Sequence, residues 1–210
     1  MKSILQHKTF SSSLSYILSK KLSTSLVSFQ SLQKLIDSIY CLDPNILTSI
    51  IKDIKFIVKN DPVVTNYSTV LLYFKGFHAL ESYRISHYLW NKQQYELSLY
   101  LQSIISRVFS VDIHPAAKIG SSIMVDHATG VVIGSSVIIE DSVIVLQSVT
   151  LGGTGKDNSK NRHPKIRKGV VIGAGAKVLG NIEVGIGSKI GAGAVVLETV
   201  PPYSTVVGIP

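Results

Sequence analysis

The sequence of 210 residues contains a single cysteine, Cys41, so no disulfide can form within the chain. This scarcity favours a reducing compartment, where free thiols persist. No apolar run approaches the roughly 18 residues that a membrane span needs, and residues 1–8 lack the apolar segment of a signal peptide. We therefore expect a cytoplasmic protein with no membrane partner.

Charged residues are also scarce, at 16% of the chain, whereas hydrophobic residues make up 45%. That apolar fraction excludes a disordered chain. The formal net charge of +8 suggests a nucleic-acid partner, but the basic residues are scattered over expected helices and no recognition motif accompanies them. We expect no nucleic-acid binding. The one basic cluster comprises Lys156, Lys160, Arg162, Lys165, Arg167 and Lys168.

Residues 1–110 have the pattern of helices. Asp43 and Pro44 form a start signal, because Asp caps a helix N-terminus and Pro suits the first turn. Isoleucines then recur at helical spacing, which predicts an amphipathic helix near 44–58. Similar patterns predict helices near 11–21, 29–40, 69–90 and 94–109. We expect 1–110 to form a helical domain.

From residue 111 onward, the apolar period changes to six. One series runs from Ile113 to Val149 and a second from Ile166 to Val196, and every position in both is Ile or Val. Neither a helix nor an alternating strand has this period, whereas a parallel β-helix does, with three repeats or about 18 residues per coil. The expected fold is therefore α+β, with residues 111–210 forming a parallel β-helix.

The two series do not join, because the step from Val149 to Ile166 is one position short of a coil. Residues 152–165 contain no Ile, Leu, Val, Phe or Met. We interpret 152–165 as a loop that leaves the β-helix and returns to it. It carries His163 and most of the basic cluster, and loops on a rigid scaffold commonly carry functional residues.

Acidic residues next to histidines mark the candidate active site. Asp112 lies two positions before His114, and Asp126 immediately precedes His127. Asp112 and His127 are separated by slightly less than one coil, so stacking would bring them together on one face. A carboxylate beside one imidazole nitrogen stabilises the imidazolium, and the other nitrogen is then free to take a proton. The alternative is that these polar side chains simply face water at coil corners.

Five segments carry a resemblance to a known family. They are YSTVLLYFKGFHALESYRISHYLW (67–90), VDIHPAAKIG (111–120), DHATGVVIG (126–134), LQSVTLGGTGK (146–156) and RHPKIRKGVVIGAGAKVLGNIEVG (162–185). Over roughly residues 10–210 the chain resembles serine acetyltransferase, which makes O-acetylserine from serine and acetyl-CoA on the way to cysteine. The resemblance implies that the β-helix is left-handed.

The resemblance also implies a role for each matching residue. His127 would be the general base that takes the proton of the serine hydroxyl, with Asp112 as its partner in a catalytic dyad. Asp61 and Asp126 would bind the serine ammonium group. Direct transfer between two bound substrates needs no acyl-enzyme, so Cys41 has no expected role.

Further implied contacts concern the serine carboxylate and the co-substrate. Arg162 and His163, from a neighbouring subunit, would hold the carboxylate. Gly153 would offer a backbone N–H near the thioester, and backbone amides around Ala174 and Ala192 would contact the pantetheine arm. Acetyl-CoA would be a co-substrate, and no metal or prosthetic group is expected.

The same family implies a homotrimer, with a dimer of trimers as the alternative. Its members usually continue past the Gly-Ile-Pro sequence at 208–210 with a tail that closes over the site during inhibition by cysteine. That tail also docks into O-acetylserine sulfhydrylase. Because this sequence ends at Pro210, we expect no such complex and weakened inhibition by cysteine.

Three other functions stay open at this point. His114, His127 and His163 could bind zinc as in trimeric β-helix carbonic anhydrases, but their spacing does not resemble the close histidine pair of that family. A related acetyltransferase acting on a sugar or another acceptor would share the six-residue repeat. A non-catalytic scaffold would lack the acid–histidine set.

Overall fold

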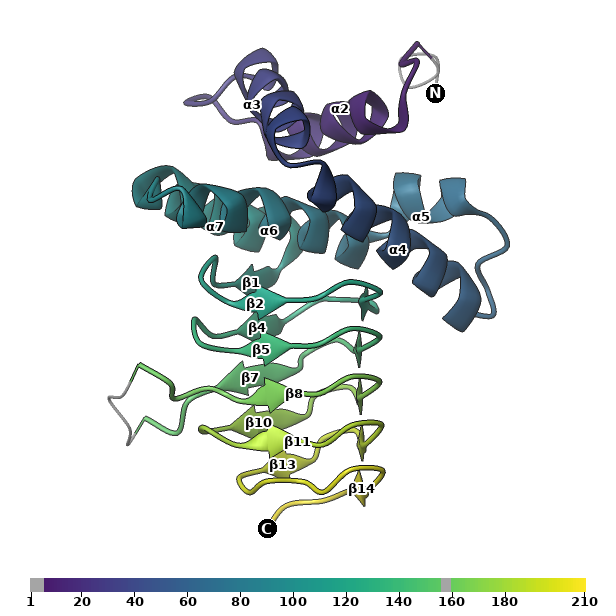
Figure 1. The fold of residues 1–210 in the computed structure, drawn as a ribbon, viewed down its shortest axis with the longest axis vertical. Coiled ribbons are helices and arrows are strands. Elements are labelled where there is room, and N and C mark those ends of the chain that lie inside the picture. Colours follow the sequence, from purple (N-terminus) through teal and green to yellow (C-terminus); the bar gives the residue numbers. More distant parts are fainter. Residues whose placement is uncertain (1–5, 156–159) are drawn as a thin grey trace.

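The structure is a computed structural model that describes residues 6–155 and 160–210. Helices form one end of the molecule and a prism of short strands forms the other, as Figure 1 shows. The helices are α2 (Phe10–Leu22), α3 (Phe29–Leu42), α4 (Pro44–Asn60), α5 (Tyr67–Tyr73), α6 (Lys75–Asn91) and α7 (Tyr95–Phe109). Helix α4 begins where the sequence predicted, with the Asp43 side chain accepting a hydrogen bond from the Asn45 N–H (3.1 Å).

Strands follow directly after α7. They are β1 (Val111–Ile113), β2 (Lys118–Ile119), β3 (Met124–Val125), β4 (Val131–Ile133), β5 (Ile138–Ile139), β6 (Ile144–Val145), β7 (Thr150–Gly152), β8 (Lys165–Ile166), β9 (Val171–Ile172), β10 (Lys177–Leu179), β11 (Glu183–Val184), β12 (Lys189–Ile190), β13 (Val195–Val196) and β14 (Thr205–Val206). The described strands pair in parallel and form three sheets. The structure thus confirms helices followed by a parallel β-helix.

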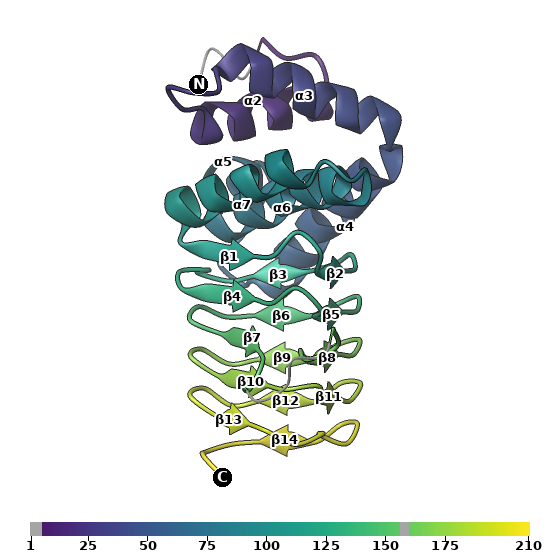
Figure 2. The same ribbon diagram turned by 90° about the vertical axis from the view of Figure 1, so that its left-hand side faces the viewer.

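The first four coils contribute one strand to each sheet, and the last contributes β13 and β14, with only an isolated bridge between Val184 and Val200 in sheet B; Figure 2 shows the coils from the side. Sheet A has the order β1-β4-β7-β10-β13, sheet B has β11-β8-β5-β2, and sheet C has β14-β12-β9-β6-β3. From β1 to β13, successive strands therefore turn a corner from A to B, from B to C and from C back to A. The loop predicted at 152–165 leaves the prism between β7 and β8 (Figure 1).

The predicted helix over 69–90 is in fact two helices. Phe74 has an extended backbone (φ −79°, ψ 105°) and separates α5 from α6. The reason is tertiary, because Gly76 at the start of α6 packs so closely on the first coil that a Cβ there would overlap the Val125 carbonyl oxygen. His78 Nε2 donates to the Leu71 carbonyl (2.8 Å) and ties the two helices together across the break.

The coils also differ in length from the prediction of three equal repeats. Strand β1 pairs with β4 as Val111 with Val131, whereas β4 pairs with β7 as Val132 with Thr150, so the first coil is two positions longer than the second. The pairing of Thr150 with Lys177 makes the next coil longer than the second by nine positions, because it contains the loop. Coil length therefore varies at the corners between the strands.

This variation corrects the interpretation of the six-residue series. Ile113 pairs with Ile133 rather than with Val131. Strands such as β4 bury both of their end residues, so each of these strands has two inward positions. The series therefore passes from one inward position to the other at the β3–β4 corner, between Val125 and Val131. Ile166 pairs with Ile139. The apparent slip of one position before Ile166 therefore has two causes: the series changes back to the other inward position, and the loop is inserted. All series members are buried except Ile119, which is partly buried against the core.

A buried ion cluster joins the helices to the first coil. Arg84 on α6 donates to Asp53 Oδ2 on α4 (2.5 Å), to Glu81 Oε2 (3.1 Å) and to the Gly120 carbonyl (2.8 Å). Asp53 Oδ1 accepts from the backbone N–H of Ile123 (2.7 Å). These contacts fix the orientation of α4 and α6 above the coil that carries the Asp126–His127 pair. Among the residues described, no helix is long and apolar enough to cross a membrane.

Candidate active site

His127 lies in the corner that leads from β3 to β4. Comparison with the corner below shows an insertion, because Val125 to Val132 spans seven positions whereas their partners Val145 and Thr150 are five apart. The two extra positions lie within 126–131. Two consecutive residues there, His127 (φ 54°) and Ala128 (φ 65°), adopt left-handed conformations without being glycine. Such strain persists only where the surroundings enforce it, and it commonly marks functional sites.

Backbone contacts hold this corner in place. The Gly130 N–H donates to the Ser110 carbonyl at the end of α7 (2.7 Å), and the Ser148 N–H donates to the Thr129 carbonyl (2.8 Å). Ala128 is fully buried beneath the start of α6. The His127 side chain, by contrast, is 72% exposed. The corner therefore presents an imidazole to solvent on a fixed backbone.

A cleft of about 420 Å³ opens between this corner and the helices. It is lined by Asp61, Val63, Val64, Thr69, Tyr73, Phe74, Lys75, Gly76, Val125, Asp126 and His127. We call it the His127 cleft. It brings together three of the predicted site residues from two distant segments, the C-cap of α4 and the β3–β4 corner.

The two acidic side chains of the His127 cleft, Asp126 and Asp61, make different contacts. Asp126 Oδ2 lies 3.6 Å from His127 Nε2, too long for a direct hydrogen bond. Asp61 Oδ1 accepts from the Val63 N–H (2.9 Å), which fixes its orientation at the cleft wall. Both carboxylates are partly exposed, so they can attract a cation without a large desolvation cost.

Asp112, the predicted partner of His127, lies on β1, the sheet-A strand that stacks directly on β4. Its Oδ1 accepts a hydrogen bond from Gln102 Nε2 on α7 (2.7 Å). Within the described residues, Asp126 is the one acid within 4.0 Å of a His127 nitrogen, so this chain by itself does not join Asp112 to His127. No pattern in the sequence indicated the Gln102 contact, because it depends on the packing of α7.

Arg162 and His163 form a second group, on the other side of sheet A, at the β4–β5 corner. We call it the His163 corner. The ring of His163 lies directly against Gly134, where an added Cβ would overlap it. His163 Nδ1 accepts from the Ser136 N–H (3.2 Å) and lies 2.7 Å from Ser136 Oγ, while the Arg162 N–H donates to Ser136 Oγ (3.2 Å).

These contacts define the chemistry of His163. Because Nδ1 accepts a hydrogen bond, the proton of the neutral ring is on Nε2, which can donate to a carboxylate. Burial lowers the pKa of His163, and the charges of Arg162 and His114 lower it further. Burial also lowers the pKa of the neighbouring His114, an effect that Asp112 opposes. The His163 corner therefore favours the neutral form of both imidazoles, beside the permanent cation of Arg162.

The predicted co-substrate residues fall in two places. Ala174 and Ala192 occupy corners from sheet C to sheet A, in the same column as His127. Backbone hydrogen bonds connect this column from coil to coil, including Gly193 N–H to the Ala174 carbonyl (2.8 Å). Gly153 instead follows β7 on the side of the His163 corner. A Cβ added to Gly153 would lie 3.5 Å from the Arg162 carbonyl oxygen.

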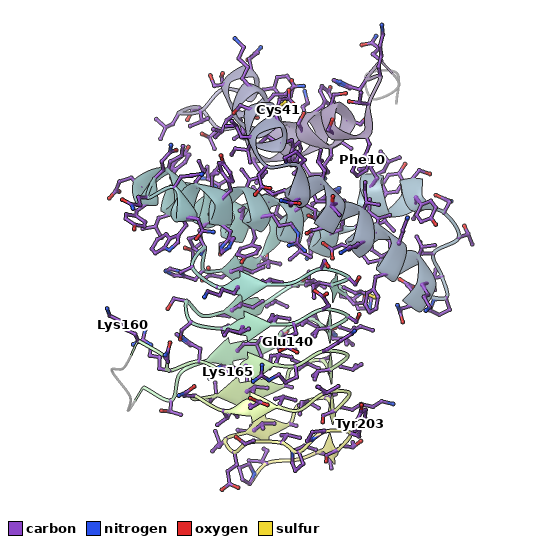
Figure 3. The ribbon with its side chains drawn as sticks, viewed as in Figure 1. Phe10, Cys41, Glu140, Lys160, Lys165 and Tyr203 are labelled. Atoms are coloured by element: carbon purple, nitrogen blue, oxygen red, sulfur yellow. The ribbon has the colours of Figure 1, made fainter. Side chains whose placement is uncertain are left out.

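Cys41 and the basic cluster were also singled out in the sequence. Cys41 is exposed near the end of α3 in the helical part (Figure 3). Lys160 is on the protruding loop (Figure 3), and Lys156 lies outside the described residues. No group of three or more metal-ligating side chains occurs in the described part of the chain.

Sequence reasoning missed Lys75, which lines the His127 cleft and donates from Nζ to Thr129 Oγ1. A lysine at the start of a predicted helix gives no signal of this contact, because Thr129 is 54 residues away.

The helical domain, the β-helix of six-residue repeats and the exposed histidine in a corner cleft define a hexapeptide-repeat acyltransferase. Comparison with known proteins narrows this class. A family model described as serine acetyltransferase, N-terminal, matches residues 1–82. The serine acetyltransferase of Buchnera aphidicola subsp. Acyrthosiphon pisum (strain APS) is 66% identical over 208 residues, covering 99% of this chain and 76% of that protein.

Solved structures agree with this assignment. Soybean serine acetyltransferase complexed with serine is 46% identical, with a TM-score of 0.96, and the match covers 100% of this chain and 86% of that one. A serine acetyltransferase in complex with CoA is 53% identical, with a TM-score of 0.94 and coverage of 98% and 85%. The chain belongs to the serine acetyltransferase family.

Proposed function

We propose that this chain transfers the acetyl group of acetyl-CoA to the hydroxyl of L-serine, giving O-acetyl-L-serine and CoA. The observation that carries the proposal is the His127 cleft, which places two carboxylates, Asp61 and Asp126, beside an exposed imidazole. A cationic amine and an alcohol on the same small molecule suit this arrangement. The relatives solved with serine and with CoA support these two substrates.

In the proposed reaction His127 acts as the general base. It takes the proton of the serine hydroxyl while the oxygen attacks the thioester carbon, so that an O–C bond forms. The tetrahedral intermediate then collapses, the C–S bond breaks, and the imidazolium returns the proton to the thiolate of CoA. A positioned base typically contributes about 10²–10⁴-fold to the rate. The Gly153 N–H is the proposed donor to the oxyanion.

Serine would be held at both ends. Asp61 and Asp126 bind its ammonium group by charge attraction. Arg162 and the Nε2–H of His163 bind its carboxylate. These two groups lie on opposite edges of sheet A in one chain, so a single chain offers two half-sites.

A homotrimer solves this separation. In a ring of three prisms, the sheet C–A edge of one protomer can face the sheet A–B edge of the next, and each interface then contains one complete site. A dimer of trimers through the helical domains is compatible with the same sites. Ala174 and Ala192 continue the His127 column along the prism, and this supports a path for the pantetheine arm beside it.

Asp112 is the proposed partner that stabilises the His127 imidazolium. Its support is position, since β1 stacks directly on the strand that follows the His127 corner. Catalytic hydrogen bonds are often long before substrate binds and shorten in the complex. We propose that Asp112 exchanges its contact with Gln102 for one with His127 when serine occupies the cleft.

The test is an acetyl-transfer assay that follows released CoA, with L-serine, threonine, glycine and a panel of sugars as acceptors. We expect serine to be the preferred acceptor. His127→Ala should lower kcat by about 10²–10⁴-fold while the chain stays folded. Near-normal turnover in His127→Ala would remove the proposed base, and preference for a sugar would favour the alternative acceptor class.

A further inference from the structure

The insertion that carries His127 needs support, because two consecutive left-handed residues that are not glycine cost about 1–2 kcal/mol each. From inside the prism, backbone hydrogen bonds and the buried Ala128 methyl support the corner. On the outer side, Thr129 is exposed, and the contact there is the hydrogen bond that its Oγ1 accepts from Lys75 Nζ.

Lys75 is poorly placed for stabilising its own helix. It is the first residue of α6, where the helix dipole disfavours a cation. The first turn of α6 contains no acidic residue, and its N-cap makes no side-chain hydrogen bond. Across the described chain, no carboxylate oxygen lies within 4.0 Å of Lys75 Nζ, so the cation is not simply part of an ion pair. Its placement points to a role outside the helix.

The backbone of α6 makes Lys75 a rigid attachment point. Gly76, the next residue, packs against the Val125 carbonyl and the Ala128 methyl with no room for a side chain. Farther along α6, Arg84 anchors the helix to the first coil through the Gly120 carbonyl. The start of α6 is therefore fixed against the first coil, and Lys75 connects it to the corner on the side that faces the His127 cleft.

We propose that Lys75 is a positioning residue for the acetyl transfer, acting through Thr129 to hold the left-handed corner that aims His127 into the cleft. This inference rests on the proposed function, in which His127 is the general base. Loss of the contact would leave the corner paired inside the prism but free to shift on its outer face. A misplacement of about 1 Å can cost about 10²-fold in rate.

The experiment compares kcat and KM for four variants of the full chain with L-serine and acetyl-CoA. We expect Lys75→Met and Thr129→Val each to lower kcat by about 10- to 100-fold, with both KM values changed less than about twofold. The double variant should be no worse than either single one, because both act through one contact. Thr129→Ser keeps the hydroxyl and should retain kcat within about twofold.

Lys118→Met is the matched control, because it removes the same charge from an exposed site on the first coil, in sheet B. Its kcat should match that of the unmodified chain. If the losses of kcat in the two single variants multiply in the double variant, the proposal is overturned. A raised KM for serine with kcat unchanged would also overturn it. So would normal turnover in Lys75→Met.

Failure of the proposed function is a separate result. It would appear as absence of serine-dependent CoA release by the unmodified chain. If another acceptor supports release, the same variants are compared with that acceptor, and the positioning role stands or falls on the same criteria. Unfolding midpoints close to that of the unmodified chain show that lost turnover does not come from lost folding.

Discussion

Arg84→Met should destabilise the protein far more than an ordinary surface substitution. Arg84 is 8% exposed, whereas Asp53 and Glu81 are fully buried. Methionine approximates the aliphatic part of arginine but removes every donor. Asp53 would then keep the Ile123 N–H as its backbone donor (2.7 Å), and the Gly120 carbonyl would lose its partner.

The expected loss is about 3–5 kcal/mol at pH 7, because removing one partner of a buried pair leaves an uncompensated charge. Burial raises the pKa of Asp53 even with Arg84 present. Without Arg84, protonation of the Asp53 carboxyl would remove the unpaired buried charge. Each unit by which the pH falls toward that pKa lowers the free energy of protonation by about 1.4 kcal/mol. The loss should therefore shrink as the pH falls from about 7 to about 5.

Urea unfolding at a fixed protomer concentration measures this difference. Arg167→Met is the control, because Arg167 also contacts two carboxylates, Glu140 (2.8 Å) and Glu183 (2.5 Å), yet is 32% exposed. Figure 3 shows Glu140 on the outside of the prism. The control should lose at most about 1 kcal/mol. Equal losses in the two variants, or a loss in Arg84→Met that does not depend on pH, would refute this reasoning.

Two further predictions concern single contacts. Gly134→Ala should displace the His163 ring, since the new Cβ would overlap it, and raise KM for serine about 10-fold or more. Ser136→Ala removes the hydroxyl next to His163 Nδ1 and should also raise KM, without the clash. An unchanged KM in both variants would argue against carboxylate binding by His163. Burial, with the Asp53 charge, raises the pKa of Glu81 well above its usual range. The folded state therefore binds that proton more tightly than the unfolded state does. The stability gained from it is complete below the usual Glu pKa of about 4.3 and falls as the pH rises toward the folded value. Glu81→Gln should remove this decline. If the free energy of unfolding, measured with urea, has parallel pH profiles in the variant and the unmodified chain, this prediction is wrong.

Much of the fold could be predicted because core positions repeat. The Ile and Val residues at six-residue intervals indicated a β-helix, since only inward-facing side chains must be apolar. The helix from Pro44 was predicted from its cap and its period. The site residues came mainly from the family resemblance, and among them Asp61, Asp126 and His127 share one cleft.

The errors arose where the core imposes no constraint. The period of six gives the inward positions but not the length of a corner, so the longer first coil was not predicted. The break at Phe74 was missed because both flanking segments have helical patterns, and the cause is the approach of Gly76 to Val125. That approach joins a helix to a coil far along the chain, and no local pattern records it.

The spacing of apolar residues was enough to establish the class of fold, because it fixes which side chains can share a core. The same residue pattern supplied the acids and histidines from which a site could be built. Their partners were selected by packing in three dimensions: Lys75 reaches Thr129, Arg84 joins Asp53, and Asp112 contacts Gln102 rather than His127. The physical reason is that a polar side chain bonds to whatever packing brings within about 3 Å, and packing here joins segments distant in the chain.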